Sequence, residues 1–475
     1  MTRVNSNISS LRATHQLLMN QDALTQSMHR LSTGLRINTG RDDPAGLIAS
    51  ETLRSEIRGI DQAIENSSRA LNVLATADSS LAEVSRMLLE IRGLIDHSAN
   101  EGALSQEELN ANQLQIDSLI ESIDRIANTS QFNGEKLLNG NYGYALSSID
   151  STKLLWTEIF GARLANDGAT LGVTVEVTQS AQTANMYFAA SGLAAGNPVS
   201  VQIGGLRGSE TFNFAASTSI TEMAYGINTF TDLTGISATT SGARMDLWST
   251  EYGADAFVSV ETLSGTFSVA GGETATIDHG RNPTALINGQ PGAADGLQVQ
   301  LRKNGLDVAF YLSESFATTE GASTTFGITG GGARFQIGPE VNSNAQLNIG
   351  IPQINSAKLG DPVIGLLRSI GGGEANSIAS QKYANAEAIV MRATMQVAIV
   401  SGRLGAIQKN QIEPNIRSQQ VAYENVKASE STIRDTEYAS EVAAMTRAQI
   451  LVQSSMMTLQ LANQIPQNVL ALLGG

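Results

Sequence analysis

The chain has 475 residues, of which 41% are hydrophobic but only 5% aromatic, and this length is enough for about three domains of roughly 150 residues each. Its formal net charge of −15 excludes a protein that binds nucleic acid through a basic surface. The chain contains no cysteine, so disulfide bonds, cysteine-ligated zinc and thiol chemistry are excluded as well.

The N-terminal segment MTRVNSNISSLRATHQ lacks both an apolar core and a small-residue cleavage site, so we expect no cleaved secretory signal. No run of about 18 apolar residues follows, so we expect no membrane insertion either. These features predict a protein that is either cytosolic or exported by an unusual route.

The first predicted helix carries a large apolar side chain at every seventh position. Leu17, Leu24 and Leu31 form one row, and Met28 and Leu35 form a second. Rows with this spacing are typical of the contact face of a coiled coil. The helix has a single apolar stripe, so we expect other helices to cover it.

The segment LRINTGRDDPAGLIA, residues 35–49, interrupts this pattern. Its acidic pair, Asp42 and Asp43, raises the question of a metal site or a catalytic dyad. Adjacent side chains point in different directions, however, and no third carboxylate or histidine lies nearby. An Asp directly before Pro44 is the favoured arrangement for capping a helix that begins with proline. We therefore predict a joint between two helices, capped by Asp42 or Asp43.

The neighbouring residues fit the same interpretation. We expect Gly34 and Gly40 to permit the turn. We expect Arg36 and Arg41 to pair with carboxylates of this subunit or of a neighbour. The set assigned to the joint is Arg36, Asn38, Arg41, Asp42, Asp43, Pro44 and Gly46.

Heptad patterns also predict the remaining helices. Apolar residues repeat over residues 57–95 and 109–126, and Ser105 with Glu108 forms a capping box before the second of these helices. The repeat returns over residues 383–407, and Pro414 predicts a kink or a break soon after it. The last helix has two rows, formed by Val442, Met456 and Leu470 and by Met445, Val452, Leu459 and Leu473.

From about residue 140 to 360 the apolar period changes from seven to two, which predicts β-strands. Val173, Val175 and Val177 alternate with polar residues in one such strand. Asn304-Gly305 joins two further alternating runs and predicts a β-hairpin.

These patterns predict an α+β multidomain fold, in which long coiled-coil-like helices from both chain ends form terminal and rod domains around an inserted β-rich outer domain. We assign residues 1–42 and 436–475 to the terminal coiled-coil domain. Residues 43–164 and 334–435 are assigned to a helical rod domain with a small β element, and residues 165–333 to the insert. The terminal helices have too few partners within one chain, so we expect self-association through them.

No residue pattern indicates an active site. His15 and His29 share a helix face but lie roughly 21 Å apart, too far to hold one metal ion. The sequence contains no HExxH, no phosphate-binding loop and no GxSxG motif. We expect no enzyme activity, no metal and no cofactor.

The helical ends resemble the bacterial flagellins. The N-terminal resemblance rests on LSTGLRINTGRDDPAGLIASETLRSEIRGI, residues 31–60, where flagellins carry a similar RINxxxDDxAG run, and on IDRIANTSQFNGEKLLNG, residues 123–140. The C-terminal resemblance rests on residues 431–473. Two separate motifs in the family's order make the resemblance specific, although it covers only about half of the chain.

This resemblance implies a subunit of the helical flagellar filament, which serves bacterial swimming. In flagellins the paired termini form an inner coiled-coil tube that is disordered in the free monomer. The rod makes most lateral contacts, and the insert faces the solvent.

The resemblance also implies partners and a location. The implied partners are identical or related flagellins, the flagellar cap and hook-associated proteins, and a cytoplasmic export chaperone that binds the C-terminal helix. The implied route is flagellar type III export to the extracellular filament, which accounts for the missing signal peptide.

One departure concerns the innate-immune flagellin receptor of animals, which in many flagellins reads an arginine-rich helix segment followed by a leucine. The matching stretch here is LEIRGLIDHSAN, residues 89–100. Leu94 is kept, but Glu90 stands where an arginine is usual, and Gln115 matches a glutamate of the next helix. We expect weak or absent receptor activation.

Three alternatives stay open at this point. A hook–filament junction protein shares both terminal motifs but matches the PQxxL ending less well. An enzyme-bearing flagellin would carry HExxH in its insert, where the only histidine is His279. A carbohydrate-binding insert would use Trp156 and Trp248, although isolated tryptophans in β domains more often belong to a core.

Overall fold

A computed structural model describes residues 6–164, 169–303 and 305–473, and the side chains of these residues other than those of Glu101 and residues 465–473. The chain divides into two compact units. The first contains Met1–Ser68, Gln336–Ala345 and Ile412–Gly475, and the second contains Arg69–Phe335 and Gln346–Gln411. Helix α2 (Pro44–Ser98) contributes residues to both units.

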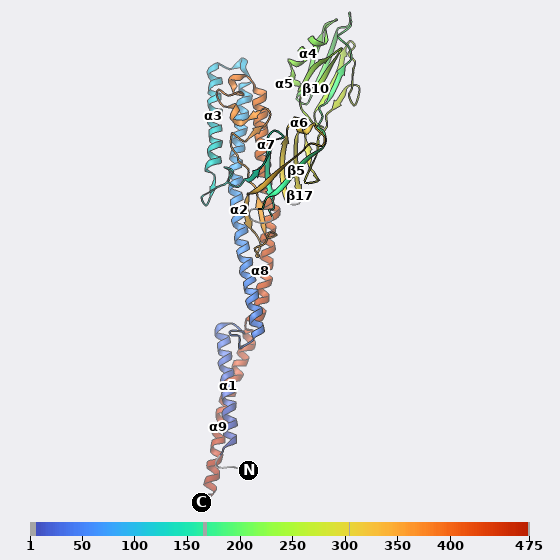
Figure 1. Cartoon of the computed structure of the whole chain (residues 1–475). Helices are drawn as coiled ribbons and strands as arrows, with labels where there is room; N and C mark the ends of the chain where they lie inside the picture. Colours follow the sequence, from blue (N-terminus) through green and yellow to red (C-terminus); the bar gives the residue numbers. More distant parts are fainter. Residues whose placement is uncertain (1–5, 165–168, 304, 474–475) are drawn as a thin grey trace. The chain divides into compact units, whose positions relative to one another are not determined.

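Long helices from the two chain ends build the first unit (Figure 1). Helices α1 (Ile8–Thr33) and α9 (Tyr438–Leu473) lie side by side and antiparallel. The Asn7 amide donates to the carbonyl of Ala462 over 2.7 Å, and the Tyr438 hydroxyl donates to the carbonyl of Leu31 over 3.0 Å. Helix α8 (Glu413–Arg434) follows the first part of α2, where the Arg434 guanidinium pairs with the Glu51 carboxylate over 2.5 Å.

The contact between α1 and α9 is built from small and polar side chains. Its buried positions are Ala13, Asn20 and Ser27 on α1 and Ala448, Ser455 and Ala462 on α9. Each set repeats every seven residues, as in a coiled coil, but among the described side chains no large apolar one occupies the centre. Small residues let the two helices approach closely, and they bury little apolar area.

A short segment, Gln336–Ala345, completes the first unit. It follows strand β20 (Ala333–Gln336), which pairs with β21 (Gln346–Ile349). Gly59 of α2 faces Pro339 of this segment so closely that a Cβ on Gly59 would lie 3.3 Å from the proline Cβ. Asn415 of α8 donates its side-chain amide to the carbonyl of Ile337 over 3.2 Å. The segment is therefore held by both α2 and α8.

The helical part of the second unit contains the remainder of α2, α3 (Gln106–Thr129) and α7 (Tyr383–Ile407). Arg92 of α2 pairs with Glu387 of α7 over 2.6 Å, and Asn112 of α3 donates to Ser98 of α2 over 3.0 Å. Most residues of their predicted heptad rows are buried, among them Leu74, Leu81, Leu88 and Ile95 on α2, Ile116 and Ile123 on α3, and Val390, Val397 and Leu404 on α7, whereas Leu71, Ile126 and Ile407 are half-buried. Short elements connect these helices: η1 (Glu101–Ala103), β1 (Gln131–Phe132), β2 (Glu135–Lys136), β22 (Gly360–Asp361), β23 (Gly365–Leu366), η2 (Leu367–Ile370) and η3 (Ile378–Ser380).

Two local predictions are confirmed in these helices. Ser105 accepts from the backbone N–H of Glu108 while the Glu108 carboxylate accepts from Ser105, which is the predicted capping box of α3. Pro414 is the second residue of α8, just after a π-helical turn, η4 (Gln408–Ile412), that separates α7 from α8. Proline has no N–H to donate and its ring crowds the carbonyl four residues back, so the wider turn replaces a regular α-helical one there.

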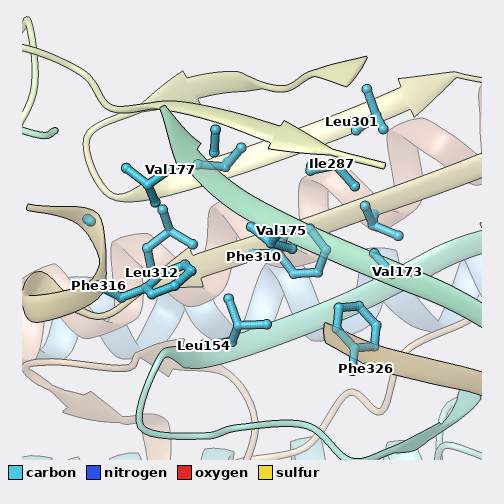
Figure 2. Close-up of a cluster of buried hydrophobic side chains, with 14 of the residues drawn as sticks. Leu154, Val173, Val175, Val177, Ile287, Leu301, Phe310, Leu312, Phe316 and Phe326 are labelled. Carbon is cyan, nitrogen blue, oxygen red and sulfur yellow. The ribbon is translucent and has the colours of Figure 1, made fainter. Parts of the chain in front are cut away.

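Two antiparallel sheets share a core in the β-rich part of the second unit. One has the strand order β15-β14-β5-β19-β3 and the other β16-β17-β18-β4. Val175 of β5 and Phe310 of β18 are among the buried side chains that fill the space between the sheets (Figure 2). The elements are β3 (Tyr144–Ser147), β4 (Leu154–Ala162), β5 (Leu171–Gln179), β14 (Thr284–Ile287), β15 (Gln290–Pro291), β16 (Ala293–Asp295), β17 (Gln298–Lys303), β18 (Leu306–Leu312), α6 (Glu314–Ala317) and β19 (Ser323–Gly331). We call this the first sandwich.

Residues 183–280 form a nested module with a core of its own. Its sheets have the orders β12-β6-β10-β9 and β13-β11-β7-β8, and Met223 and Ile227 of α4 pack into the core between them. Its elements are β6 (Asn185–Phe188), β7 (Val199–Gly205), β8 (Gly208–Phe214), α4 (Ile220–Asn228), α5 (Thr231–Thr234), β9 (Ile236–Ser241), β10 (Arg244–Ser249), β11 (Phe257–Ser264), β12 (Val269–Ala270) and β13 (Ile277–His279). The module begins and ends at a β-bridge between Gln182 and Arg281.

The predicted fold class is confirmed, because long helices from both chain ends flank a β-rich middle. The predicted strand with Val173, Val175 and Val177 is β5, and all three valines are fully buried. The predicted hairpin is β17–β18, with Gly305 in the left-handed conformation at a φ of 75°. Asn304 lies outside the described residues.

Candidate self-association surface and joint

The leucine rows predicted on α1 flank its contact with α9 instead of filling it. Leu17, Leu24 and Leu31 are half-buried, as are Met445, Val452 and Leu459 of α9. Met28, Val442 and Met456 are exposed, and the side chain of Leu470 lies outside the described residues. The prediction for Leu35 is wrong in one respect. Helix α1 ends at Thr33, so Leu35 leaves the helical row and forms a β-bridge with Asp435.

Large apolar side chains lie exposed on the outer faces of both helices. Leu11 is 67% exposed and Met457 is 66% exposed. The others include Ile8, Leu18 and Met19 on α1 and Ile450, Leu451 and Leu461 on α9. A water-soluble helix pair normally presents polar residues on these faces. The pair therefore carries uncovered apolar surface of the kind that marks a protein–protein contact.

Sequence reasoning missed the residues that hold the pair together. The Asn20 amide, 7% exposed, donates to the Ser455 hydroxyl over 2.7 Å. At the other end of the pair, Arg30 approaches the Glu441 carboxylate to within 3.7 Å. A search for large apolar residues at heptad spacing passes over Asn, Ser and Ala. The same spacing among small residues is the signal that identifies this seam.

The two aspartates of the joint have separate structural roles. Asp43 caps α2, because its Oδ1 accepts from the backbone N–H of Gly46 over 2.9 Å and α2 begins at Pro44. Asp42 instead closes the preceding loop by accepting from the backbone N–H groups of Asn38 and Thr39. These two hydrogen bonds hold the pKa of Asp42 below its usual value. The capping prediction is confirmed, with Asp43 as the cap.

Within the described part of this chain Arg36 does not pair with a carboxylate as predicted, and its pairing with a neighbouring subunit stays a prediction. Its guanidinium donates to the backbone carbonyl of Ile433 over 2.6 Å, and not to a carboxylate. Ile433 lies in the last turn of α8, where carbonyls have no partner within the helix, so a main-chain acceptor is available to Arg36. Arg41 is exposed, and none of the ion pairs found in residues 6–164, 169–303 and 305–473 involves it.

Glycine is required at two positions of the joint. Gly34 ends α1 in the left-handed conformation, with a φ of 73°. Gly46 has no room for a side chain, because a Cβ would lie 2.5 Å from Asp43 Oδ2 and 2.6 Å from Ile37 Cδ1. Gly40 has no positive φ, so the prediction that it permits the turn is wrong. Ile37, only 1% exposed, is a core residue of the joint that the sequence did not reveal.

Backbone hydrogen bonds tie together the two connections between the helix pairs. Arg36 donates its N–H to the carbonyl of Arg434 over 2.7 Å, and Thr436 donates to the carbonyl of Gly34 over 2.9 Å. The Asn38 amide also donates to the Thr33 hydroxyl over 2.9 Å at the end of α1. The passage from α1 to α2 and the passage from α8 to α9 therefore form one structural element.

The three positions matched to the receptor epitope lie on two helices. Glu90 and Gln115 are exposed on α2 and α3, and Leu94 is half-buried on α2. Trp156 and Trp248, considered for carbohydrate binding, lie on β4 of the first sandwich and β10 of the nested module. They belong to different sheets, so the structure does not bring them into one site.

Possible metal ligands are scattered over the described part of the chain. No three His, Asp or Glu side chains in residues 6–164, 169–303 and 305–473 gather closely enough to hold a metal ion. Within the same ranges no helix combines the length and the hydropathy needed to cross a membrane.

Comparison with known proteins places both helical ends in one family. Residues 4–143 match the bacterial flagellin N-terminal helical region, and residues 388–473 match the bacterial flagellin C-terminal helical region. The chain is 28% identical to flagellin B of Vibrio cholerae over 471 residues, covering 99% of both chains. It is 27% identical to the flagellin of Salmonella typhimurium over 516 residues, again covering 99% of both.

A hook-associated protein is a weaker match. The crystal structure of flagellar hook-associated protein 3 from Legionella pneumophila is 14% identical to the chain and covers 81% of it, with a TM-score of only 0.30. This likeness is too low to support a junction protein against the full-length flagellin matches. The chain therefore belongs to the bacterial flagellin family, whose members are structural subunits of the flagellar filament.

Proposed function

We propose that the chain polymerises with copies of itself, or of related flagellins, through the exposed faces of α1 and α9. The observation that carries this proposal is the pair itself, which has a seam of small residues and large apolar side chains on its outer faces. Covering those side chains with the helices of neighbouring subunits removes them from water, at about 25 cal/mol per Å² of apolar area.

This arrangement couples the order of the terminal helices to assembly. Within one chain their contact buries mainly Ala13, Asn20 and Ser27 against residues of similar size. Such a contact offsets little of the conformational entropy lost when two long helices become ordered. Neighbouring subunits supply the missing burial, so the pair is most stable in the filament.

We propose that three parts of the chain occupy different places in the filament. Residues 1–42 and 436–475 form the inner tube, residues 43–164 and 334–435 form the rod, and residues 165–333 form the solvent-exposed insert. Strands β3 and β4 precede residue 165 but pair with β19 and β18. We propose that these two strands are the small β element of the rod and that they join it to the insert.

The proposed partners follow from the place of the subunit in the flagellum. They are the cap and hook-associated proteins at the ends of the filament, and a cytoplasmic chaperone that covers the C-terminal helix before type III export. The net charge of −15 opposes binding to nucleic acid. We propose an extracellular structural role in swimming, with no enzyme activity, cofactor or membrane insertion.

The same assignment predicts weak recognition by the innate-immune receptor. Glu90 places a negative charge where a cation is usual, and Gln115 lacks the charge of a glutamate. Purified monomer should give little signal in a receptor reporter assay, and Glu90→Arg with Gln115→Glu should raise it. Strong signalling by the unaltered chain would refute this proposal.

Charged substitutions on the exposed faces test the assembly proposal directly. Leu18→Asp and Met457→Asp should reduce the sedimented filament more than tenfold, because each buries an unpaired carboxylate between subunits. The readouts are sedimentation and electron microscopy of the full-length chain. Leu24→Asp and Val452→Asp, at half-buried positions, should also abolish filaments.

Matched controls separate lost assembly from added charge. Gln21→Asp on α1 and Gln453→Asp on α9 introduce the same carboxylate at exposed polar positions of the same helices. We expect filaments from both controls. Filaments of normal yield from Leu18→Asp and Met457→Asp would overturn the assignment of these faces.

A further inference from the structure

The outer face of one sheet of the nested module carries charged and aromatic side chains together. Strand β10, labelled in Figure 1, lies between β6 and β9 in this sheet. It presents Arg244, Asp246 and Trp248 on the outer face, because alternate residues of a strand point to the same side of the sheet. The residues between them, Met245 and Leu247, belong to the core of the module. The three outer side chains therefore form a row along one strand.

Asp246 fixes the position of the Arg244 guanidinium group. Asp246 is only 2% exposed, and the Arg244 Nε lies 3.1 Å from its Oδ1 and 3.3 Å from its Oδ2. The guanidinium also stacks over the ring of Tyr187 on β6, with its Cζ 4.8 Å from the ring centre. A buried carboxylate that loses its cation is strongly destabilising, so Asp246 keeps the arginine in this place.

The other nitrogen atoms of this guanidinium have no protein partner. Nη1 and Nη2 of Arg244 donate to no acceptor in residues 6–164, 169–303 and 305–473, and the residue is exposed. Arg207, the second arginine of the module, directs its Nε and Nη2 to Glu251 over 3.2 and 3.1 Å. Arg244 therefore presents a fixed pair of donors to the solvent, and such a pair matches two neighbouring oxygen atoms of a ligand.

The indole of Trp248 also has a fixed orientation. Its Nε1 donates to the Thr239 hydroxyl over 3.2 Å, although Ser237 is the residue directly opposite Trp248 on β9. The ring thus reaches diagonally over the edge strand of the sheet, and the residue is 37% exposed. Because its N–H is already satisfied, the ring offers the solvent an apolar aromatic surface.

We propose that Trp248 and Arg244 form a binding site for a neutral oligosaccharide. One sugar ring packs its C–H groups on the indole, and hydroxyl groups of a linked sugar accept from Nη1 and Nη2 of Arg244. The step from Arg244 to Trp248 along the strand spans about 13 Å. A single sugar ring on the indole does not reach the guanidinium over that distance, whereas a chain of linked sugars does.

The charge of the module favours a neutral ligand over an anionic one. Residues 183–280 contain nine Asp or Glu and only two Arg or Lys. This charge repels an anionic glycan as it approaches, and the charge of Arg244 is already balanced by Asp246. We therefore expect neutral glycans to bind more tightly than their sialylated or sulfated derivatives.

A glycan array and a local spectroscopic probe test the proposal on the full-length chain. The array carries neutral oligosaccharides of glucose, galactose, mannose and N-acetylglucosamine, together with sialylated and sulfated derivatives. The chain has two tryptophans, so its ¹⁵N-labelled form gives two indole N–H signals, which Trp156→Phe assigns. Titration with the neutral oligosaccharide that binds best should shift the signal of Trp248 and leave that of Trp156 in place.

Matched variants separate the two contacts. Trp248→Gln should weaken binding about tenfold, whereas Tyr225→Gln, which removes an exposed ring from α4 of the same module, should leave it unchanged. Arg244→Lys keeps a cation beside Asp246 but removes the planar pair of donors, so it should also weaken binding about tenfold. Arg207→Lys is its control and should bind like the unaltered chain.

Four results would overturn the proposal. They are an array without any bound neutral oligosaccharide, binding of sialylated or sulfated glycans alone, a Trp248 signal that does not move in the titration, and unchanged affinity in both Trp248→Gln and Arg244→Lys. Circular dichroism of each variant shows whether a loss of binding reflects a loss of structure, and the titration of the unaltered chain does not depend on any variant.

Discussion

Gly46 and Gly93 both lie in α2, but only Gly93 has room for a side chain. No atom lies within 4 Å of a Cβ built on Gly93, whereas a Cβ on Gly46 would meet Asp43 Oδ2 at 2.5 Å. Alanine is favoured over glycine inside a helix by about 1 kcal/mol, so Gly93→Ala should stabilise the chain slightly. Gly46→Ala should destabilise the joint by about 1–3 kcal/mol, since it forces the capping carboxylate and Ile37 to move.

Chemical denaturation followed by circular dichroism measures both variants. Hydrogen exchange at the backbone N–H groups of residues 36–50 localises the effect to the joint. If both substitutions stabilised the chain, the close contacts around Gly46 would not require a glycine.

Asp42 makes the loop of the joint sensitive to acid. Its pKa is lowered by hydrogen bonds from the backbone N–H groups of Thr39 and Asn38. A carboxyl group whose folded pKa is depressed stabilises the fold above its unfolded value, here 3.8, and loses that effect as the pH falls through the folded value. We therefore expect the amides of Asn38 and Thr39 to lose protection from exchange only at a pH below about 3.8, after correction for intrinsic rates.

Asp42→Asn should remove that pH dependence, because its amide stays uncharged. Asp61→Asn, on an exposed turn of α2, serves as the control and should leave it in place. If the amides of Asn38 and Thr39 lose the same protection in acid in the Asp42→Asn chain, a group other than Asp42 causes the loss.

At the scale of single elements, the N-terminus of α3 tests how much a capping box contributes. Ser105→Ala removes the hydroxyl that accepts from the Glu108 N–H, and a lost cap of this kind costs about 1 kcal/mol. Ser118→Ala makes the same change in the middle of α3 at an exposed position, where alanine is the better helix former. We expect the first to lower and the second to preserve or raise the midpoint of urea unfolding. Equal midpoints for the two variants would mean that the cap contributes nothing measurable.

The elements that the sequence predicted well are those whose signal is local. The heptads of α2 and α7, the Ser105 cap and the Asn304-Gly305 turn each need only neighbouring residues to be recognised. The seam of Ala13, Asn20 and Ser27 was missed because its residues are neither large nor apolar. The side chain of Ile37 is buried by a loop that folds back on α2, and no periodicity marks such a residue.

At the scale of the whole molecule, the pairing of the strands shows which of them share a core, and the sequence did not predict this. Alternating apolar residues mark β5 and β7 equally well, but they do not tell which strands share a core. Val175 belongs to the first sandwich, and Val201 belongs to the nested module. The chain enters and leaves that module at Gln182 and Arg281, which no composition change marks. The assignment of the domains along the chain therefore stays a proposal.

The ends of the nested module lie so close together that the module should be removable. Gln182 and Arg281 exchange two backbone hydrogen bonds of 2.9 Å each, so an Asn-Gly turn can replace residues 183–280. If assembly depends on α1 and α9, the shortened chain should still form filaments visible by electron microscopy. The full-length Leu18→Asp chain is the reciprocal case, with an intact module and no filaments expected. If the shortened chain keeps its helical circular dichroism but fails to assemble, the nested module must contain subunit contacts that assembly requires.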